Sequence, residues 1–118
     1  MNQVNIVGRL GKDPELKYTP NGKAVVKLSV AVNERYGGET RTYWFPVVCW
    51  NGLAETVAQY LKQGSKIAVN GRLISRSYDA GNGNRTVIEI IAKQVDFLDG
   101  KSSEKAEEGP EVEDEIPF

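Results

Sequence analysis

The chain has 118 residues, of which 40% are hydrophobic, and a formal net charge of −1. This length suits one folded domain and is too short for two separate cores. One cysteine and no histidine exclude an internal disulfide and leave a zinc site without its usual ligands. No signal-like or membrane-spanning apolar run is present, so we expect a cytoplasmic protein without a membrane contact, metal or cofactor.

The charge is divided unevenly along the chain. Residues 1–100 carry 13 Lys and Arg against 9 Asp and Glu, whereas residues 101–118 carry 2 against 7. Such asymmetry is typical of a folded body with an interaction tail of opposite sign. We therefore predict one domain over residues 1–100 and an acidic, disordered tail over residues 101–118, because the tail has too few apolar residues to offset the entropy of folding.

The first half of the body reads as three strands. Residues 3–10 alternate apolar and polar side chains, and after turn residues at 13–14 and 19–22 the even positions of 24–33 are apolar. A Gly-rich loop at 36–39 leads to a third strand over 41–51. Its Pro46 cannot donate a ladder hydrogen bond, which predicts a sheet edge, a bulge or a side without a partner strand.

The second half reads as one helix and two strands. Residues 53–62 have helical spacing, with Asn51 as the expected cap and Gly64 as the stop. Strands follow over 66–78, with Ile67, Val69 and Leu73 on the expected core side, and from about Thr86 to Phe97. An all-β chain of five strands, with one helix between the third and fourth, has the element order of the OB-fold, a five-stranded barrel known for oligonucleotide binding.

Alternation also predicts which aromatic side chains lie outside the core. On the third strand the side that holds Tyr43, Phe45, Val47 and Cys49 is the more continuously apolar, so Trp44 and Trp50 are expected to point outward. Ordinary core or subunit-interface packing is the alternative for any single ring. Basic neighbours favour base stacking for the set as a whole. The expected stacking residues of one groove are Tyr36, Trp44, Trp50 and Tyr78.

Basic side chains of the body supply the expected phosphate contacts. Arg72 and Arg76 are preferred because they share a strand side with Tyr78, and Arg35 and Lys62 come next. Each phosphate neutralised on a single strand steepens the log–log salt dependence of binding by roughly 0.7. The modest basic excess of the body predicts moderate salt sensitivity.

No residue pattern indicates catalysis. Without histidine, a Ser or Cys nucleophile lacks its commonest base, and residues 8–12 do not form a Gly-Lys-Ser/Thr phosphate loop. Asp13 with Glu15, or Asp79 with Glu89, leaves a Mg²⁺-dependent nuclease as the enzyme alternative, although scattered carboxylates are usually solvated surface groups. We predict that the protein is not an enzyme.

The tail ends in chemical groups that solubility alone does not require. Carboxylates, an apolar side chain, a φ-restricted proline and a terminal aromatic ring follow one another in Glu113, Asp114, Glu115, Ile116, Pro117 and Phe118. A basic pocket with an apolar floor on another protein fits this combination. We predict a partner-docking tip; the alternative is a merely solubilising tail.

Several segments resemble the bacterial single-stranded DNA-binding protein family. The similarity covers residues 1 to about 99 and is carried by residues 5–15, 18–22, 44–50, 53–55 and 60–65, and the tip at 113–118 resembles that family's partner-binding end. The resemblance implies a homotetramer of OB-folds that binds single-stranded DNA without sequence preference in replication, recombination and repair. It also implies recruitment of partner proteins through the tip.

The resemblance further implies roles for individual residues. The family's stacking positions fall on the four aromatic residues named above, and its Arg and Lys contacts fall on Arg76 and Lys62. Basic residues of some members are replaced here by Pro46, Gly52, Gln63 and Ile74. This departure implies a lower DNA affinity unless Arg72 compensates. Phe45 stands at a subunit-contact position where several members have His, so the tetramer is carried over with this difference.

Two other binding classes stay open at this point. An RNA-binding OB-fold of cold-shock type uses the same stacking chemistry, and a scaffold barrel mainly contacts proteins. The linker between body and tip is only about a dozen residues long. A short tether raises the effective concentration of the acidic tip near the basic groove. We therefore predict that the tail competes with DNA.

Overall fold

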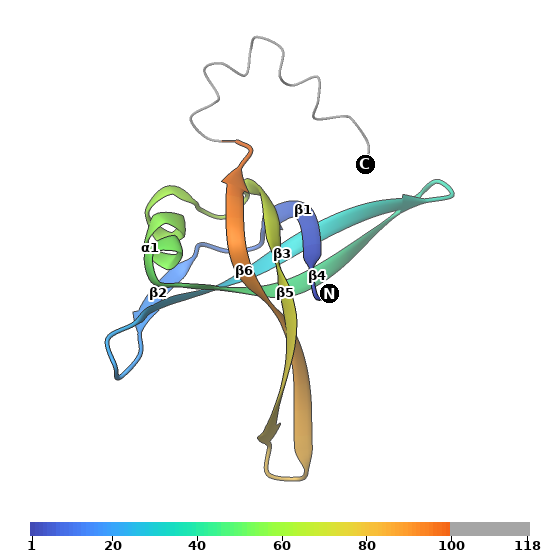
Figure 1. Ribbon diagram of the computed structural model, residues 1–118. Helices are drawn as coiled ribbons and strands as arrows, with labels where there is room; N and C mark the ends of the chain where they lie inside the picture. Colours follow the sequence, from blue (N-terminus) through green and yellow to red (C-terminus); the bar gives the residue numbers. More distant parts are fainter. Residues whose placement is uncertain (100–118) are drawn as a thin grey trace.

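The strands of the computed structural model, which describes residues 1–99, form one curved sheet (Figure 1). Its elements in chain order are β1 (Val4–Leu10), β2 (Glu15–Tyr18), β3 (Ala24–Tyr36), β4 (Glu39–Trp50), α1 (Asn51–Tyr60), β5 (Lys66–Asp79) and β6 (Asn84–Phe97). All five strands expected from the sequence are present. β2 was not expected, because its four residues are all exposed and show no burial period.

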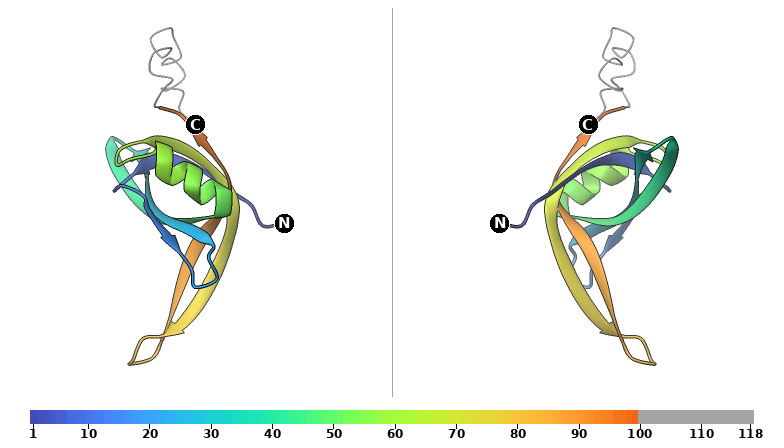
Figure 2. Two further views of the ribbon diagram at one scale, coloured as in Figure 1. Left: turned by 90° about the vertical axis from the view of Figure 1, so that its left-hand side faces the viewer. Right: turned by 90° about the vertical axis from the view of Figure 1, so that its right-hand side faces the viewer.

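The sheet closes into a barrel. Its strand order is β1-β5-β6-β4-β3-β2, and an additional pairing of β1 with β3 joins the two sides. That closure is short, with Arg9 opposite Ala31 and Leu10 opposite Val30. β4 and β6 run parallel, while the other pairs are antiparallel. Figure 2 looks along the barrel and shows α1 lying across its opening. The predicted five-stranded OB-like barrel with one helix is confirmed.

Both expected boundaries of the helix are wrong. Asn51 does not cap it from outside: it is the first helical residue, with a left-handed φ of 57°, and the capping position is Trp50, whose side chain makes no capping hydrogen bond. The chain turns directly from β4 into α1, and Asn tolerates the left-handed conformation that this turn requires. The helix ends at Tyr60, well before Gly64, which instead donates its N–H to the Leu10 carbonyl.

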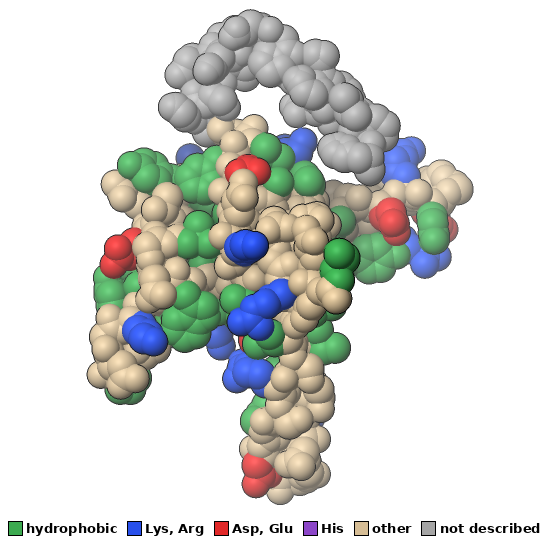
Figure 3. Space-filling view, viewed as in Figure 1, with side chains coloured by type: hydrophobic (Ala, Val, Ile, Leu, Met, Phe, Trp, Pro, Cys, Tyr) green, Lys and Arg blue, Asp and Glu red, His purple; other side chains and the backbone are tan. Residues whose placement is uncertain are grey.

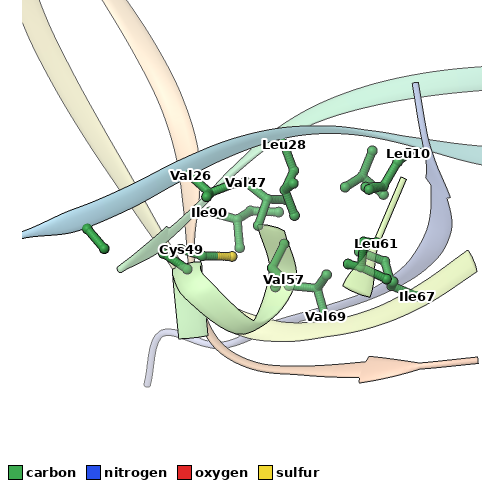
Figure 4. Close-up of a cluster of buried hydrophobic side chains, with 13 residues drawn as sticks. Leu10, Val26, Leu28, Val47, Cys49, Val57, Leu61, Ile67, Val69 and Ile90 are labelled. Atoms are coloured by element: carbon green, nitrogen blue, oxygen red, sulfur yellow. The ribbon is translucent and has the colours of Figure 1, made fainter. Parts of the chain in front are cut away.

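The core lies between the inner sides of the strands and α1 (Figure 4). Alternate residues of β3, from Ala24 to Val30, face it, as the sequence predicted. Val47, Val57 and Ile67 are fully buried and come from β4, α1 and β5. The cluster therefore ties the helix to both halves of the barrel, and this packing fixes the orientation of the opposite, outward side chains.

Two pairs of strands extend beyond the barrel as arms (Figure 1). The β3–β4 arm turns at Gly37 and Gly38, both with positive φ, which a two-residue hairpin turn requires. The β5–β6 arm explains one error of prediction. Leu73 was expected in the core beside Val69, yet it is 44% exposed because β5 has left the barrel at that point.

Cys49 is expected to be unreactive in the folded protein. Its side chain is fully buried, and burial raises the pKa of its thiol from 9.0 to about 12. The thiolate is the reactive form, so at pH 8 we expect labelling by a thiol reagent only after denaturant is added. Rapid stoichiometric labelling of the native protein at pH 8 would contradict this expectation.

Candidate nucleic-acid interface

One face of the sheet, opposite to the core, gathers most of the predicted site residues. In register, Val48 of β4 lies beside Ile91 of β6, and Ile91 lies opposite Arg72 of β5. Side chains of paired residues share a face, and every second residue of a strand does so as well. We call the resulting surface the outer face; it comprises Trp44, Pro46, Val48, Trp50, Lys27, Val87, Glu89, Ile91, Arg72, Ile74, Arg76 and Tyr78.

Three of the four predicted stacking rings belong to the outer face. Trp44 is 57% exposed, Trp50 is 37% exposed and Tyr78 is 49% exposed. The expectation that both tryptophans point outward is confirmed, because Val47 and Cys49 between them occupy the core. Such half-exposed rings present an aromatic face to solvent while the strand holds their base.

Tyr36 lies elsewhere. It pairs with Glu39 near the end of the β3–β4 arm, and alternation places it on the side opposite to Trp44. The Arg41 guanidinium carbon lies 5.2 Å from the Tyr36 ring centroid, within the range of a cation–π contact. The structure therefore does not bring Tyr36 into one groove with the other three rings, and a cation already lies against its ring.

Trp44 lies against the chain just after β1. A Cβ built on Gly11 would overlap the six-membered part of the Trp44 indole ring, so the ring covers a position that only glycine fits. Gly11 donates its N–H to the Ser29 carbonyl at 2.9 Å, which fixes the backbone beneath the ring. Gly11 was not among the residues singled out from the sequence. A glycine beside a strand end signals a close approach, but not what approaches.

Gly11→Ala is expected to displace the Trp44 ring and to shift the Trp fluorescence spectrum of the free protein. We also expect weaker binding of poly(dT), by less than the loss caused by removal of the ring. Gly52→Ala is the matched control, because a Cβ at Gly52, close to Trp50, meets no atom within 4 Å. An unchanged spectrum and unchanged affinity for Gly11→Ala would show that the ring does not need this seat.

The four predicted phosphate contacts occupy different settings. Arg72 is exposed on the outer face, and its side chain makes no ion pair or hydrogen bond within residues 1–99. Arg35 is exposed on the β3–β4 arm, on the same side as Trp44 by alternation. Lys62 lies in the turn after α1, where its N–H donates to Ser65 Oγ. That turn is tied to Leu10 by two backbone hydrogen bonds, which places it next to the seat of Trp44.

Arg76 is held by a carboxylate. Its Nε donates to Glu89 Oε1 at 3.0 Å and its Nη2 donates to Glu89 Oε2 at 3.1 Å, which is the bidentate geometry of a strong charge-assisted pair. Glu89 is only 7% exposed. The hydrogen bonds from Arg76 lower the pKa of Glu89, and desolvation works against that shift. The same hydrogen bond raises the pKa of Arg76.

The pair makes a pH-dependent contribution to stability. Because the pKa of folded Glu89 lies below the ordinary value of 4.5, its contribution is fully present above that pH and is lost as pH falls through the lowered pKa. At neutral pH the pair is therefore intact.

Glu89 was considered from the sequence only as a possible Mg²⁺ ligand. A better signal was available: it is the sole charge in the apolar run from Val87 to Ala92, and a buried carboxylate needs a cationic partner. The other carboxylates of that alternative also have protein partners. Asp13 accepts the Gln63 N–H at 2.7 Å, and Asp79 accepts the Gly81 N–H at 3.0 Å.

Positive charge accompanies the exposed rings. Figure 3 shows Lys and Arg side chains over β6 and the base of the β5–β6 arm, with hydrophobic side chains between them. Neutralisation of Glu89 by Arg76 and Lys27 removes the main negative group from this surface. Planar rings beside accessible cations, carried on the strands of an OB-like barrel, define a nucleic-acid-binding module of the oligonucleotide-binding class.

Comparison with known proteins identifies the family. Residues 1–98 match the Single-strand binding protein family, so the chain belongs to it. It is 45% identical over 108 residues to a single-stranded DNA-binding protein of Halalkalibacterium halodurans, covering 88% of this chain and 64% of that protein. The match to single-stranded DNA-binding protein A of Bacillus subtilis is 45% identical over 106 residues and covers 86% of this chain and 62% of that one.

A shorter relative matches over almost the whole chain. Single-stranded DNA-binding protein 2 of Clostridium acetobutylicum is 42% identical over 123 aligned positions, which cover 98% of this chain and 92% of the relative. The chain thus spans less than two thirds of the first two relatives and nearly all of the third. In residues 1–99, no helix is long and apolar enough to cross a membrane.

Proposed function

We propose that this protein binds single-stranded DNA without sequence preference. The observation that carries the proposal is the outer face, where Trp44, Trp50 and Tyr78 are exposed beside Arg72. Every base has a π-face, so stacking on these rings tolerates any sequence and contributes roughly 1–3 kcal/mol per base. In a duplex the faces are stacked on neighbouring pairs and are inaccessible to the rings. The printed names of the relatives support the same ligand.

The arrangement assigns different tasks to rings and cations. The rings of β4 and β5 hold successive bases, and Arg72 contacts a phosphate between them. Arg35 on the β3–β4 arm and Lys62 beside the Trp44 seat extend the positive surface away from Arg72. Because the basic excess is small, binding is expected to depend moderately on salt concentration.

The test is a reverse titration with poly(dT), followed by quenching of Trp fluorescence at two salt concentrations. We expect strong quenching that weakens at the higher salt concentration. Equal-length poly(U) tests the RNA-binding alternative, and tighter binding of poly(U) than of poly(dT) would favour it. Unquenched fluorescence with both polymers would favour the scaffold alternative, and cleavage of a labelled strand with added Mg²⁺ would favour a nuclease.

We further propose that the protein acts as a homotetramer. The β1 edge supports an assembly: β1 pairs with β5 from Val4 onward, but it meets β3 only at Arg9 and Leu10, which leaves the preceding residues unpaired on that side within residues 1–99. An unpaired strand edge is a template for another chain. Sedimentation equilibrium measures the assembly, and a monomer at micromolar concentration would contradict it.

The tail proposal concerns residues outside those that the structure describes. We propose that Glu113, Asp114, Glu115, Ile116, Pro117 and Phe118 recruit replication, recombination and repair proteins in the cytoplasm, at the nucleoid. The domain division into residues 1–100 and 101–118 is part of this proposal. A chain ending at Gly100 is expected to bind poly(dT) more tightly than the full chain at low salt, and equal salt-dependent affinities would contradict tail competition.

A further inference from the structure

Glu89 is an anomaly on the outer face. Within residues 1–99 it is the one polar or charged residue in the buried class, and it lies on β6 between Val87 and Ile91 of that face. A carboxylate there loses hydration and repels phosphate, so a surface that only had to attract a polyanion would not bury one. The inference that follows rests on the proposed function and concerns how this surface counts phosphates.

The geometry of the pair shows what the carboxylate does. Both of its oxygens accept a hydrogen bond from the same guanidinium, at 3.0 and 3.1 Å, so the fork of Arg76 is matched to Glu89. The Arg76 side chain nevertheless stays 51% exposed. The outer face therefore presents the body of Arg76 to a ligand while its charge is compensated.

A phosphate cannot take Arg76 without stranding Glu89. The departing guanidinium would leave a buried carboxylate with only the more distant charge of Lys27, and a buried charge that loses its partner is strongly unfavourable. Arg72, two cross-strand pairs along β5, has no competing partner within residues 1–99. A phosphate therefore gains more from Arg72 than from Arg76.

We propose that Glu89 masks the charge of Arg76 and so lowers the number of phosphates that this face neutralises. In the complex the pair remains closed. Arg76 offers its planar guanidinium to a base beside Tyr78, and Arg72 supplies the phosphate contact. This assignment replaces the sequence-based expectation that Arg76 is itself a phosphate contact.

The slope of log affinity against log salt concentration tests the proposal, because one phosphate contact on a single strand changes it by about 0.7. For each protomer that contacts poly(dT), Arg72→Ala is expected to reduce the slope by about 0.7. Arg76→Ala is expected to weaken binding without changing the slope. Glu89→Gln keeps a hydrogen-bond acceptor but frees the charge of Arg76, so it is expected to steepen the slope by about 0.7.

Two further variants make the test robust. Glu55→Gln removes the same charge from an exposed position on α1, and it is expected to leave the slope unchanged. Arg76→Ala alone leaves Glu89 unpaired and can unfold the protein, so Arg76→Ala combined with Glu89→Gln removes both charges. That double variant is expected to keep the wild-type slope, and a thermal melt checks that it is folded.

The opposite pattern overturns the proposal. If Arg76→Ala, or the double variant, lowers the slope as much as Arg72→Ala while Glu89→Gln leaves it unchanged, Arg76 contacts phosphate and Glu89 does not mask it. That result would leave the proposed function standing, since binding itself is retained. Absence of poly(dT) binding by the wild-type protein would instead refute the proposed function and this inference with it.

Discussion

Trp44→Ala and Trp50→Ala are each expected to weaken poly(dT) binding by roughly 5- to 150-fold, the equivalent of one stacked base at about 1–3 kcal/mol. Both rings are exposed on the outer face and are held by β4, whose inner residues are fixed in the core. Each variant is also expected to lose a substantial part of the fluorescence quenching. The salt slope should stay close to the wild-type value, because neither ring contacts phosphate by charge.

Tyr36→Ala provides a comparison within the same predicted set. Tyr36 lies on the opposite side of the β3–β4 arm and is in contact with Arg41, so its removal is expected to cost less affinity than either tryptophan. The measurement is the same poly(dT) titration at one salt concentration. Wild-type binding by both Trp variants would remove these rings from the site, and a larger loss for Tyr36→Ala would move the site to the other side of the arm.

Ile67→Ala is expected to destabilise the fold by about 2–5 kcal/mol. Ile67 is fully buried on β5, and its truncation removes apolar contacts and leaves a cavity among side chains from several strands and α1. In a domain of this size, each kcal/mol lowers Tm by about 4–8 °C, so we expect a decrease of at least about 8 °C. Thermal unfolding followed by circular dichroism measures it.

Ile88→Ala is the matched control for the core. It removes the same atoms from a β6 position that is 57% exposed, and the expected change is within about 0.5 kcal/mol. Ile67 does not lie on the outer face, so its variant should bind poly(dT) normally at a temperature where it remains folded. Equal stabilities of the two variants would contradict the core described here.

The third strand shows how far the sequence alone could go. Its inner side is apolar at every second position from Tyr43 to Cys49, so alternation correctly predicts that Trp44 and Trp50 face outward. Burial on one side of a strand is a local property, and a period of two residues records it directly. Fold class followed in the same way, from the order of five such strands and one helix.

β6 shows where the same reasoning stops. Between Val87 and Ala92 nearly every residue is apolar, so no period of two is visible. The register shift opposite Asn70 and Gly71 changes which residues of β6 face inward, from Val95 to Ala92 and Ile90. That irregularity belongs to the pairing of two strands and cannot be seen in either one. It is the reason that Glu89 faces outward toward Arg76.

The sequence by itself determined the barrel class, the outward tryptophans and the contrast between a basic body and an acidic end, because these depend on local periodicity and on composition. Only the tertiary structure decided the partners of these residues. It separated Tyr36 from the other rings, seated Trp44 on Gly11 and joined Arg76 to Glu89. Such contacts depend on strand register and on the twist of the barrel, which bring together residues far apart in the chain and leave no periodic trace in it.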